Sequence, residues 1–154
     1  MTHDQAEALA VSDQIVVMDG GRVAQAGTPQ QLYEQPGSAF VAGFMGEAML
    51  FDAEVDADGQ VRLGPLRFAP RQPVAAGAVK VAVRPEAWIV GPAGGPGLAG
   101  TVTKTAYLGH GQELSFDTAL GVVFVVCGDA RTPWAPGQRV SLSLGSAGVS
   151  VVAA

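Results

Sequence analysis

The pattern of apolar and polar positions changes character near residue 46. Before that point, short apolar runs alternate with segments whose apolar residues recur at helical spacing. Beyond it, apolar and polar residues alternate in short runs separated by Gly and Pro, which is typical of strands joined by tight turns. The pattern therefore predicts a small mixed α/β segment over residues 1–46 and an all-β unit over residues 47–154.

Local signals place the elements of the first segment. We predict helices at residues 5–11, 29–35 and 38–45, and a β-hairpin with strands at residues 15–18 and 22–26. Asp4 and Glu7 have the spacing of a capping box for the first helix. Thr28 and Gln31 have the same spacing before the second, with Pro29 at the first helical position.

The second segment reads as about ten short strands. They are predicted at residues 49–55, 60–63, 66–68, 79–83, 87–90, 98–108, 113–117, 121–126, 138–144 and 149–152. Close turns favour one or two small barrels, because closure removes exposed sheet edges. Residues 91–97 are Gly or Pro at six of seven positions, so we predict a connecting loop. Its prolines lack N–H donors and no lysine follows, which argues against a phosphate cradle.

Composition excludes several function classes. The net charge of −5 is unsuited to a nucleic-acid surface. No apolar run approaches the roughly 20 residues that span a bilayer, so we expect no direct membrane insertion. Cys127 is the only cysteine, which excludes an intramolecular disulfide, and we predict a buried thiol in a strand. His3, His110 and Cys127 are scattered along the sequence, so we expect no zinc site. These features fit a cytoplasmic protein whose cysteine stays reduced.

His3 is the candidate catalytic residue. It lies directly before the first predicted helix, where backbone N–H groups and the helix dipole favour an anion such as phosphate. Taken alone, a histidine in this position is more often an ordinary surface or core residue. The order of the motifs that follow decides in favour of the functional interpretation.

Four motifs carry a resemblance to a known family. T-H-D-Q-A-E-A-L, I-V-V-M-D-G-G-R-V, G-T-P-Q-Q-L-Y-E-Q-P and F-V-A-G-F-M-G follow one another over the first 46 residues. This order resembles the end of the ATPase subunit of ABC importers of the maltose, polyamine, sulfate and iron(III) type. The resemblance implies that His3 is the switch histidine, which contacts the γ-phosphate of ATP across a closed nucleotide sandwich. It also implies ATP and Mg as cofactors, transmembrane permease subunits and a second ATPase subunit as partners, a homodimer, and a cytoplasmic position at the inner face of the membrane.

The motifs that hold the nucleotide do not occur in the chain. It contains no G-x-x-x-x-G-K-[ST] phosphate loop, no L-S-G-G-Q signature and no strand that ends in an Asp-Glu pair. We therefore interpret the sequence as a C-terminal fragment and expect no ATP hydrolysis by this chain alone. Without a preceding domain, Phe40 and Phe44 are expected to be partly exposed, and residues 1–46 to oligomerise or repack.

The second segment continues the resemblance. V-A-V-R-P-E at residues 81–86, then G-T-V and Y-L-G, resemble the TOBE domain that follows the ATPase domain in this family. The implied fold is mainly β: an OB-like TOBE barrel over residues 47–154, with a regulatory or subunit-contact role, preceded by an α/β remnant of the ATPase domain. F-M-G-E-A-M-L-F, A-Y-L-G and the terminal G-V-S-V-V resemble the iron(III) and polyamine branches more than the maltose branch.

Two other functions stay open at this point. A free-standing TOBE-like module that binds an oxyanion or small ligand would use convergent donors, such as Thr101, Thr103, Lys104 and Thr105. Strand alternation sends these four side chains to different faces. An independent hydrolase built on His3 lacks a nucleophile and an orienting acid nearby.

Five further residues have predicted structural roles. Arg84 and Glu86 flank Pro85, whose turn can align their charges for a pair within the barrel or across an interface, and we predict a structural role for them. Trp88 and Trp134 suit the core or an interface, with Trp134 the better interface residue because prolines surround it. His110 lies between two glycines and is expected to be exposed at a turn.

Overall fold

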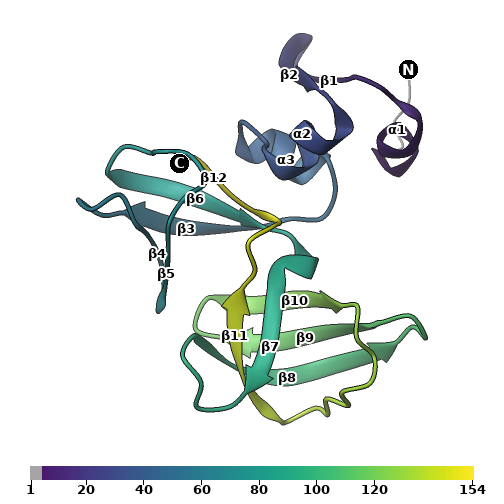
Figure 1. Ribbon diagram of the computed structural model, residues 1–154, viewed down its shortest axis with the longest axis vertical. Helices are drawn as coiled ribbons and strands as arrows, with labels where there is room; N and C mark the ends of the chain where they lie inside the picture. Colours follow the sequence, from purple (N-terminus) through teal and green to yellow (C-terminus); the bar gives the residue numbers. More distant parts are fainter. Residues whose placement is uncertain (1–4) are drawn as a thin grey trace.

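The N-terminal part of the molecule is a hairpin with three short helices (Figure 1). The computed structural model describes residues 5–154. The elements are α1 (Gln5–Val11), β1 (Ile15–Asp19), β2 (Arg22–Gly27), α2 (Pro29–Glu34) and α3 (Ala39–Phe44). β1 and β2 pair as an antiparallel hairpin. Every one of these elements lies within one residue of its predicted bounds.

Side-chain caps define where α2 and α3 begin. The Thr28 hydroxyl accepts a hydrogen bond from the Gln31 N–H at 3.2 Å, and the Gln31 side chain accepts one from the Thr28 N–H at 2.9 Å. The predicted capping box is therefore confirmed. Ser38 caps α3 by accepting a hydrogen bond from the Val41 N–H. The predicted cap at Asp4 lies outside the described residues.

A small core of its own holds the N-terminal part together. It consists of the buried residues Val17, Leu32, Val41 and Met45. On the neighbouring face of α3, Phe40 and Phe44 stack at 5.7 Å between ring centroids and remain 40% and 38% exposed. Their partial exposure agrees with the prediction, while the expected oligomerisation or repacking stays a prediction.

Ten strands form two five-stranded sheets in the rest of the chain (Figure 1). The first sheet has the order β12-β6-β3-β4-β5, with β3 (Met49–Val55), β4 (Val61–Leu63), β5 (Leu66–Phe68), β6 (Gly77–Val83) and β12 (Val149–Ala153). The second has the order β10-β9-β8-β11-β7, with β7 (Trp88–Pro92), β8 (Leu98–Tyr107), β9 (Gln112–Thr118), β10 (Gly121–Cys127) and β11 (Arg139–Leu144). Neighbouring strands are antiparallel in both sheets.

The two sheets share one core and depend on each other. A single cluster of buried side chains includes Val81 of the first sheet and Phe116 and Leu142 of the second. The chain leaves the first sheet through the 3₁₀ turn η1 (Pro85–Ala87) and returns to it only with β12, which pairs with β6. The second sheet curls into an OB-like half-barrel, so the predicted mainly-β, OB-like fold is confirmed.

Two details differ from the prediction. Cys127 is half-buried rather than buried, because it ends β10, an edge strand of the second sheet. Residues 91 and 92, predicted as loop, belong to β7 and pair with β11. The rest of that loop folds back closely: Gly97 has φ +140°, and a Cβ there would lie 2.4 Å from the Leu142 carbonyl oxygen.

Candidate functional site

The predicted catalytic residue lies outside the part of the chain that the structure describes. His3 precedes residue 5, so its contact with a γ-phosphate stays a prediction. Within residues 5–154, no group of three or more His, Cys, Asp or Glu side chains is arranged to hold a metal ion. Over the same residues, no helix is both long and apolar enough to cross a bilayer.

The described residues place their main polar cluster where the helices meet the first sheet. We call this contact region the seam, and Arg84, at the end of β6, is its centre. The Arg84 Nη1 donates to the carbonyl oxygens of Ala42 at 2.9 Å, Gly46 at 3.0 Å and Glu47 at 3.2 Å. Its Nη2 donates to the Tyr33 carbonyl oxygen at 3.2 Å. Arg84 is only 3% exposed, so these carbonyls replace the hydrogen bonds that its guanidinium would make with water.

The partners of Arg84 explain why a buried cation is stable there. The carbonyls belong to α2, to α3 and to the turn after α3, where helix carbonyls lack intrahelical donors. The helix dipole also favours a positive charge at a C-terminus. Neither α2 nor α3 has a basic residue in its last turn. Arg84 therefore supplies from the barrel the donors that the helices lack.

Tyr33 and Glu86 complete the cluster. The Arg84 guanidinium lies 4.2 Å from the centroid of the Tyr33 ring, in a cation–π contact. The Tyr33 hydroxyl donates a hydrogen bond to the Glu86 carboxylate. Burial, followed by this hydrogen bond and the Glu86 charge, raises the pKa of Tyr33 to about 12, while the Arg84 charge acts in the opposite direction. Burial lowers the pKa of Arg84, opposed by the charges of Tyr33 and Glu86.

The predicted pairing of Arg84 with Glu86 is wrong. Between them, Pro85 begins the 3₁₀ turn η1, and each side chain has a different partner across the seam. Arg84 binds backbone carbonyls, whereas Glu86 binds the Tyr33 hydroxyl. One sequence signal could have found this arrangement: two short helices that end without a basic residue need donors from elsewhere.

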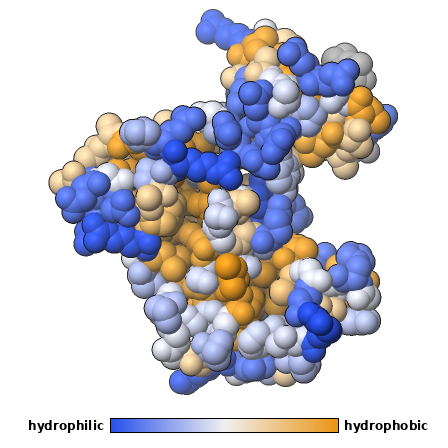
Figure 2. Space-filling model, viewed as in Figure 1, coloured by the Kyte–Doolittle hydropathy of each residue, from blue (hydrophilic) through white to orange (hydrophobic). Residues whose placement is uncertain are grey.

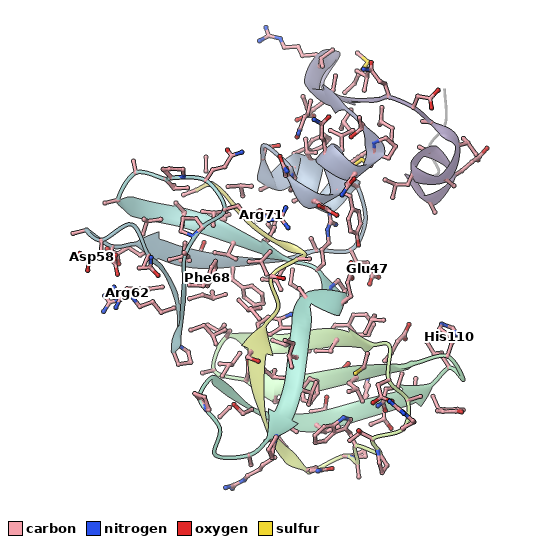
Figure 3. All side chains as sticks on the ribbon, in the orientation of Figure 1. Glu47, Asp58, Arg62, Phe68, Arg71 and His110 are labelled. Atoms are coloured by element: carbon pink, nitrogen blue, oxygen red, sulfur yellow. The ribbon has the colours of Figure 1, made fainter. Side chains whose placement is uncertain are left out.

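A second set of contacts crosses the seam beside α2. The Ser150 hydroxyl donates to the Glu34 carbonyl oxygen at 3.2 Å, and Arg71 Nη1 lies 3.7 Å from the Glu34 carboxylate. Figure 3 shows Arg71 beneath the helices, between them and the first sheet. These contacts border a cavity of about 780 Å³. We call it the Arg71 cavity, and it is lined by residues 34–37, 68–74, 144–146 and 149–153.

The remaining predicted residues do not converge on one site. Thr101, Thr103, Lys104 and Thr105 all lie on β8, where the register with β9 shifts between Val102 and Lys104. The Thr103 hydroxyl donates to the Ser115 carbonyl oxygen.

Trp88 and His110 lie where the sequence predicts, and an interface role for Trp134 stays a prediction. Trp88 is buried in the core, in an edge-to-face contact with Phe51. Trp134 is partly buried against the same core. His110 is exposed at its turn, as predicted.

Comparison with known proteins identifies the class of domain that this fold represents. Residues 81–152, which include the second sheet and all but the last residue of β12, match the TOBE domain family. The ModG protein, a cytoplasmic molybdate-binding protein crystallised with molybdate, has a similar fold. The similarity has a TM-score of 0.52 at 17% identity, over 67% of this chain and 94% of that one.

Relatives that match most of the chain are ATP-binding subunits of importers. The chain is 41% identical to the Fe(3+) ions import ATP-binding protein FbpC of Agrobacterium fabrum, over 99% of this chain and 44% of that protein. It is 44% identical to the Brucella abortus protein of the same name, over 82% of this chain and 37% of that one. The chain thus spans less than half the length of these curated relatives. It matches the C-terminal part of ABC importer ATP-binding subunits, TOBE domain included, as its motifs predicted.

Proposed function

We propose that this chain acts as the C-terminal part of the ATP-binding subunit of an ABC importer for iron(III). Residues 1–46 are the end of the nucleotide-binding domain and residues 47–154 are the accessory barrel. In the whole subunit, ATP and Mg bind to segments that precede this chain in the relatives. His3 contacts the γ-phosphate and supports hydrolysis there, and the barrel has a regulatory role.

The observation that carries this proposal is the match along 99% of the chain to a protein named for Fe(3+) import. Because these relatives are importer ATP-binding subunits, we propose transmembrane permease subunits as partners, together with a second ATPase subunit in a homodimer. The subunit would lie in the cytoplasm, at the inner face of the membrane. The contacts of Arg84 support a coupling between residues 1–46 and the barrel, because they join the C-terminal ends of α2 and α3 to it.

A chimeric subunit tests the role of His3. This chain replaces the matched C-terminal part of the Agrobacterium fabrum relative, and phosphate release and iron(III) uptake are measured. We expect an active chimera that loses ATP hydrolysis roughly a hundredfold or more on His3→Ala, because a preorganised donor to the reacting phosphate is removed. His110→Ala is the matched control, since His110 is the second of the two histidines and is exposed. Equal activity of the two variants would contradict the role of His3.

The isolated chain provides an independent check. We expect no phosphate release above background from the 154-residue chain, because it contains no phosphate-binding loop. Release that disappears on His3→Ala would contradict this expectation. Calorimetric titration with molybdate, sulfate and tungstate tests the alternative, a free-standing oxyanion or small-ligand module. A tight, stoichiometric response would favour that alternative.

A further inference from the structure

The Arg71 cavity lies where the first sheet is open. β5 and β12 are the two edge strands of this sheet, and residues of both line the cavity. The sheet therefore curves so that its two free edges face a common space, which α2 borders from above in Figure 3. Its volume of about 780 Å³ lies within the range of about 300–1,000 Å³ that is usual for small-molecule sites.

The guanidinium at this cavity has unused hydrogen-bonding capacity. Arg71 Nη1 is 3.7 Å from the Glu34 carboxylate, beyond hydrogen-bond range, and Nη2 is 3.4 Å from the Ser146 carbonyl oxygen, at the long limit. Arg67, on the same sheet, instead lies 2.8 Å from the Asp56 carboxylate. Because one donor makes this long bond to Ser146 and the Glu34 contact is loose, most of the five N–H donors of Arg71 can donate to a closer anion.

The rest of the lining defines the kind of anion. Arg71 and Glu34 are the two charged residues of the lining, so the cavity offers one positive charge with one carboxylate loosely beside it. Glu34 repels any anion, and a ligand with a single negative charge meets the smaller repulsion while it still neutralises Arg71. Phe68, Val74 and Val151 supply apolar surface for the body of the ligand. Figure 2 shows apolar surface (orange) between the two sheets, next to hydrophilic surface (blue) at the helices.

The free edge of β12 adds a second group of donors. β12 pairs with β6 on one side only, so alternate backbone N–H groups point toward the free edge. Residues 149–153 all line the cavity. A carboxylate can therefore bind Arg71 through a two-pronged contact while the ligand lies along this edge.

We propose that the Arg71 cavity binds a small organic monocarboxylate with an apolar body. The bound ligand displaces Glu34 from Arg71. It also contacts β12, whose Ser150 hydroxyl donates to the Glu34 carbonyl at the end of α2. Binding thereby changes how the helices attach to the barrel. This binding does not depend on the proposed ATPase role, since it is measured on this chain alone.

The test is a titration followed by amide chemical shifts of the 154-residue chain. The probes are hexanoate and phenylacetate, with hexanamide as the uncharged control and inorganic phosphate as the control for an anion without an apolar body. We expect saturable shifts within about 10 mM hexanoate at residues 68–74 and 149–153, and no matching response to hexanamide. Arg71→Gln should weaken hexanoate binding at least about tenfold, while Arg62→Gln, the same change elsewhere on this sheet, should not.

Each other result overturns the inference. Equal responses to hexanoate and hexanamide would show that the carboxylate is not recognised. Binding that survives Arg71→Gln would exclude Arg71 as the anion contact. A response to phosphate alone would overturn the ligand class, and no response to hexanoate or phenylacetate would exclude the site. An unchanged amide spectrum of Arg71→Gln away from the cavity verifies that this variant is folded.

Discussion

Two arginines cross the same seam, and they do so in opposite ways. Arg84 is buried, with four carbonyl acceptors and an aromatic ring around its guanidinium. Arg71 is exposed and reaches Glu34 and Ser146 only at 3.7 Å and 3.4 Å. A buried cation with satisfied donors stabilises one arrangement, whereas an exposed cation with loose partners can exchange them. The Arg84 contact is therefore the fixed attachment of the helices, and the Arg71 contact the adjustable one.

The largest effect is expected from Arg84→Met, which keeps much of the side-chain volume and removes every donor. Four carbonyls at the helix ends lose their partner in a buried place. We expect a loss of roughly 2–4 kcal/mol in the free energy of unfolding of the helices, measured by urea denaturation followed through their amide signals. Arg62→Met, on the exposed side of β4, is the control. A loss no larger than that of Arg62→Met would mean that Arg84 does not anchor the seam.

A smaller, pH-dependent effect is expected from Tyr33→Phe. The folded-state pKa of Tyr33 is raised from 10.0 to about 12, so the unfolded chain releases the phenolic proton first as pH rises. The contribution of Tyr33 to stability is thus complete below pH 10 and is lost as pH rises toward 12. Wild type should lose more stability than Tyr33→Phe across this window, measured by thermal unfolding. Parallel pH curves for the two proteins would contradict the raised pKa of Tyr33 and its hydrogen bond to Glu86.

The smallest effect is expected from Arg71→Gln without added ligand. Its partners are distant and its side chain is 41% exposed, so the change in unfolding free energy should stay within about 0–1 kcal/mol. Urea denaturation beside Arg84→Met gives the comparison. A loss comparable to that of Arg84→Met would remove the distinction between the fixed and the adjustable contact.

The sequence was informative wherever structure depends on near neighbours. The capping box of Thr28 and Gln31, the Gly20-Gly21 turn and the alternation along β3 located their elements within a residue. The resemblance to importer ATPases then supplied His3, which the described structure does not reach.

The long-range contacts were beyond such reasoning. Arg84 meets Tyr33 and Ala42 across 51 and 42 positions, and Ser150 meets Glu34 across 116. The ends of α2 and α3 lack a basic residue and so indicate a need for donors, but no local pattern identifies Arg84 as their source. The nearer charge, Glu86, was therefore predicted as the partner of Arg84. The Arg71 cavity was missed for the same reason, since it exists only because β12 returns to the edge of the first sheet.

Hydrogen exchange of individual amides in Arg84→Met tests most directly whether this arginine attaches the helices to the barrel. The Met45 amide of α3's C-cap, bonded to the Val41 carbonyl, reports on the helices, and the amides of β9 report on the core. We predict that protection at Met45 falls at least about tenfold, equivalent to about 1.4 kcal/mol, while protection in β9 is retained. Unchanged protection at Met45, or an equal fall at both places, would contradict the attachment.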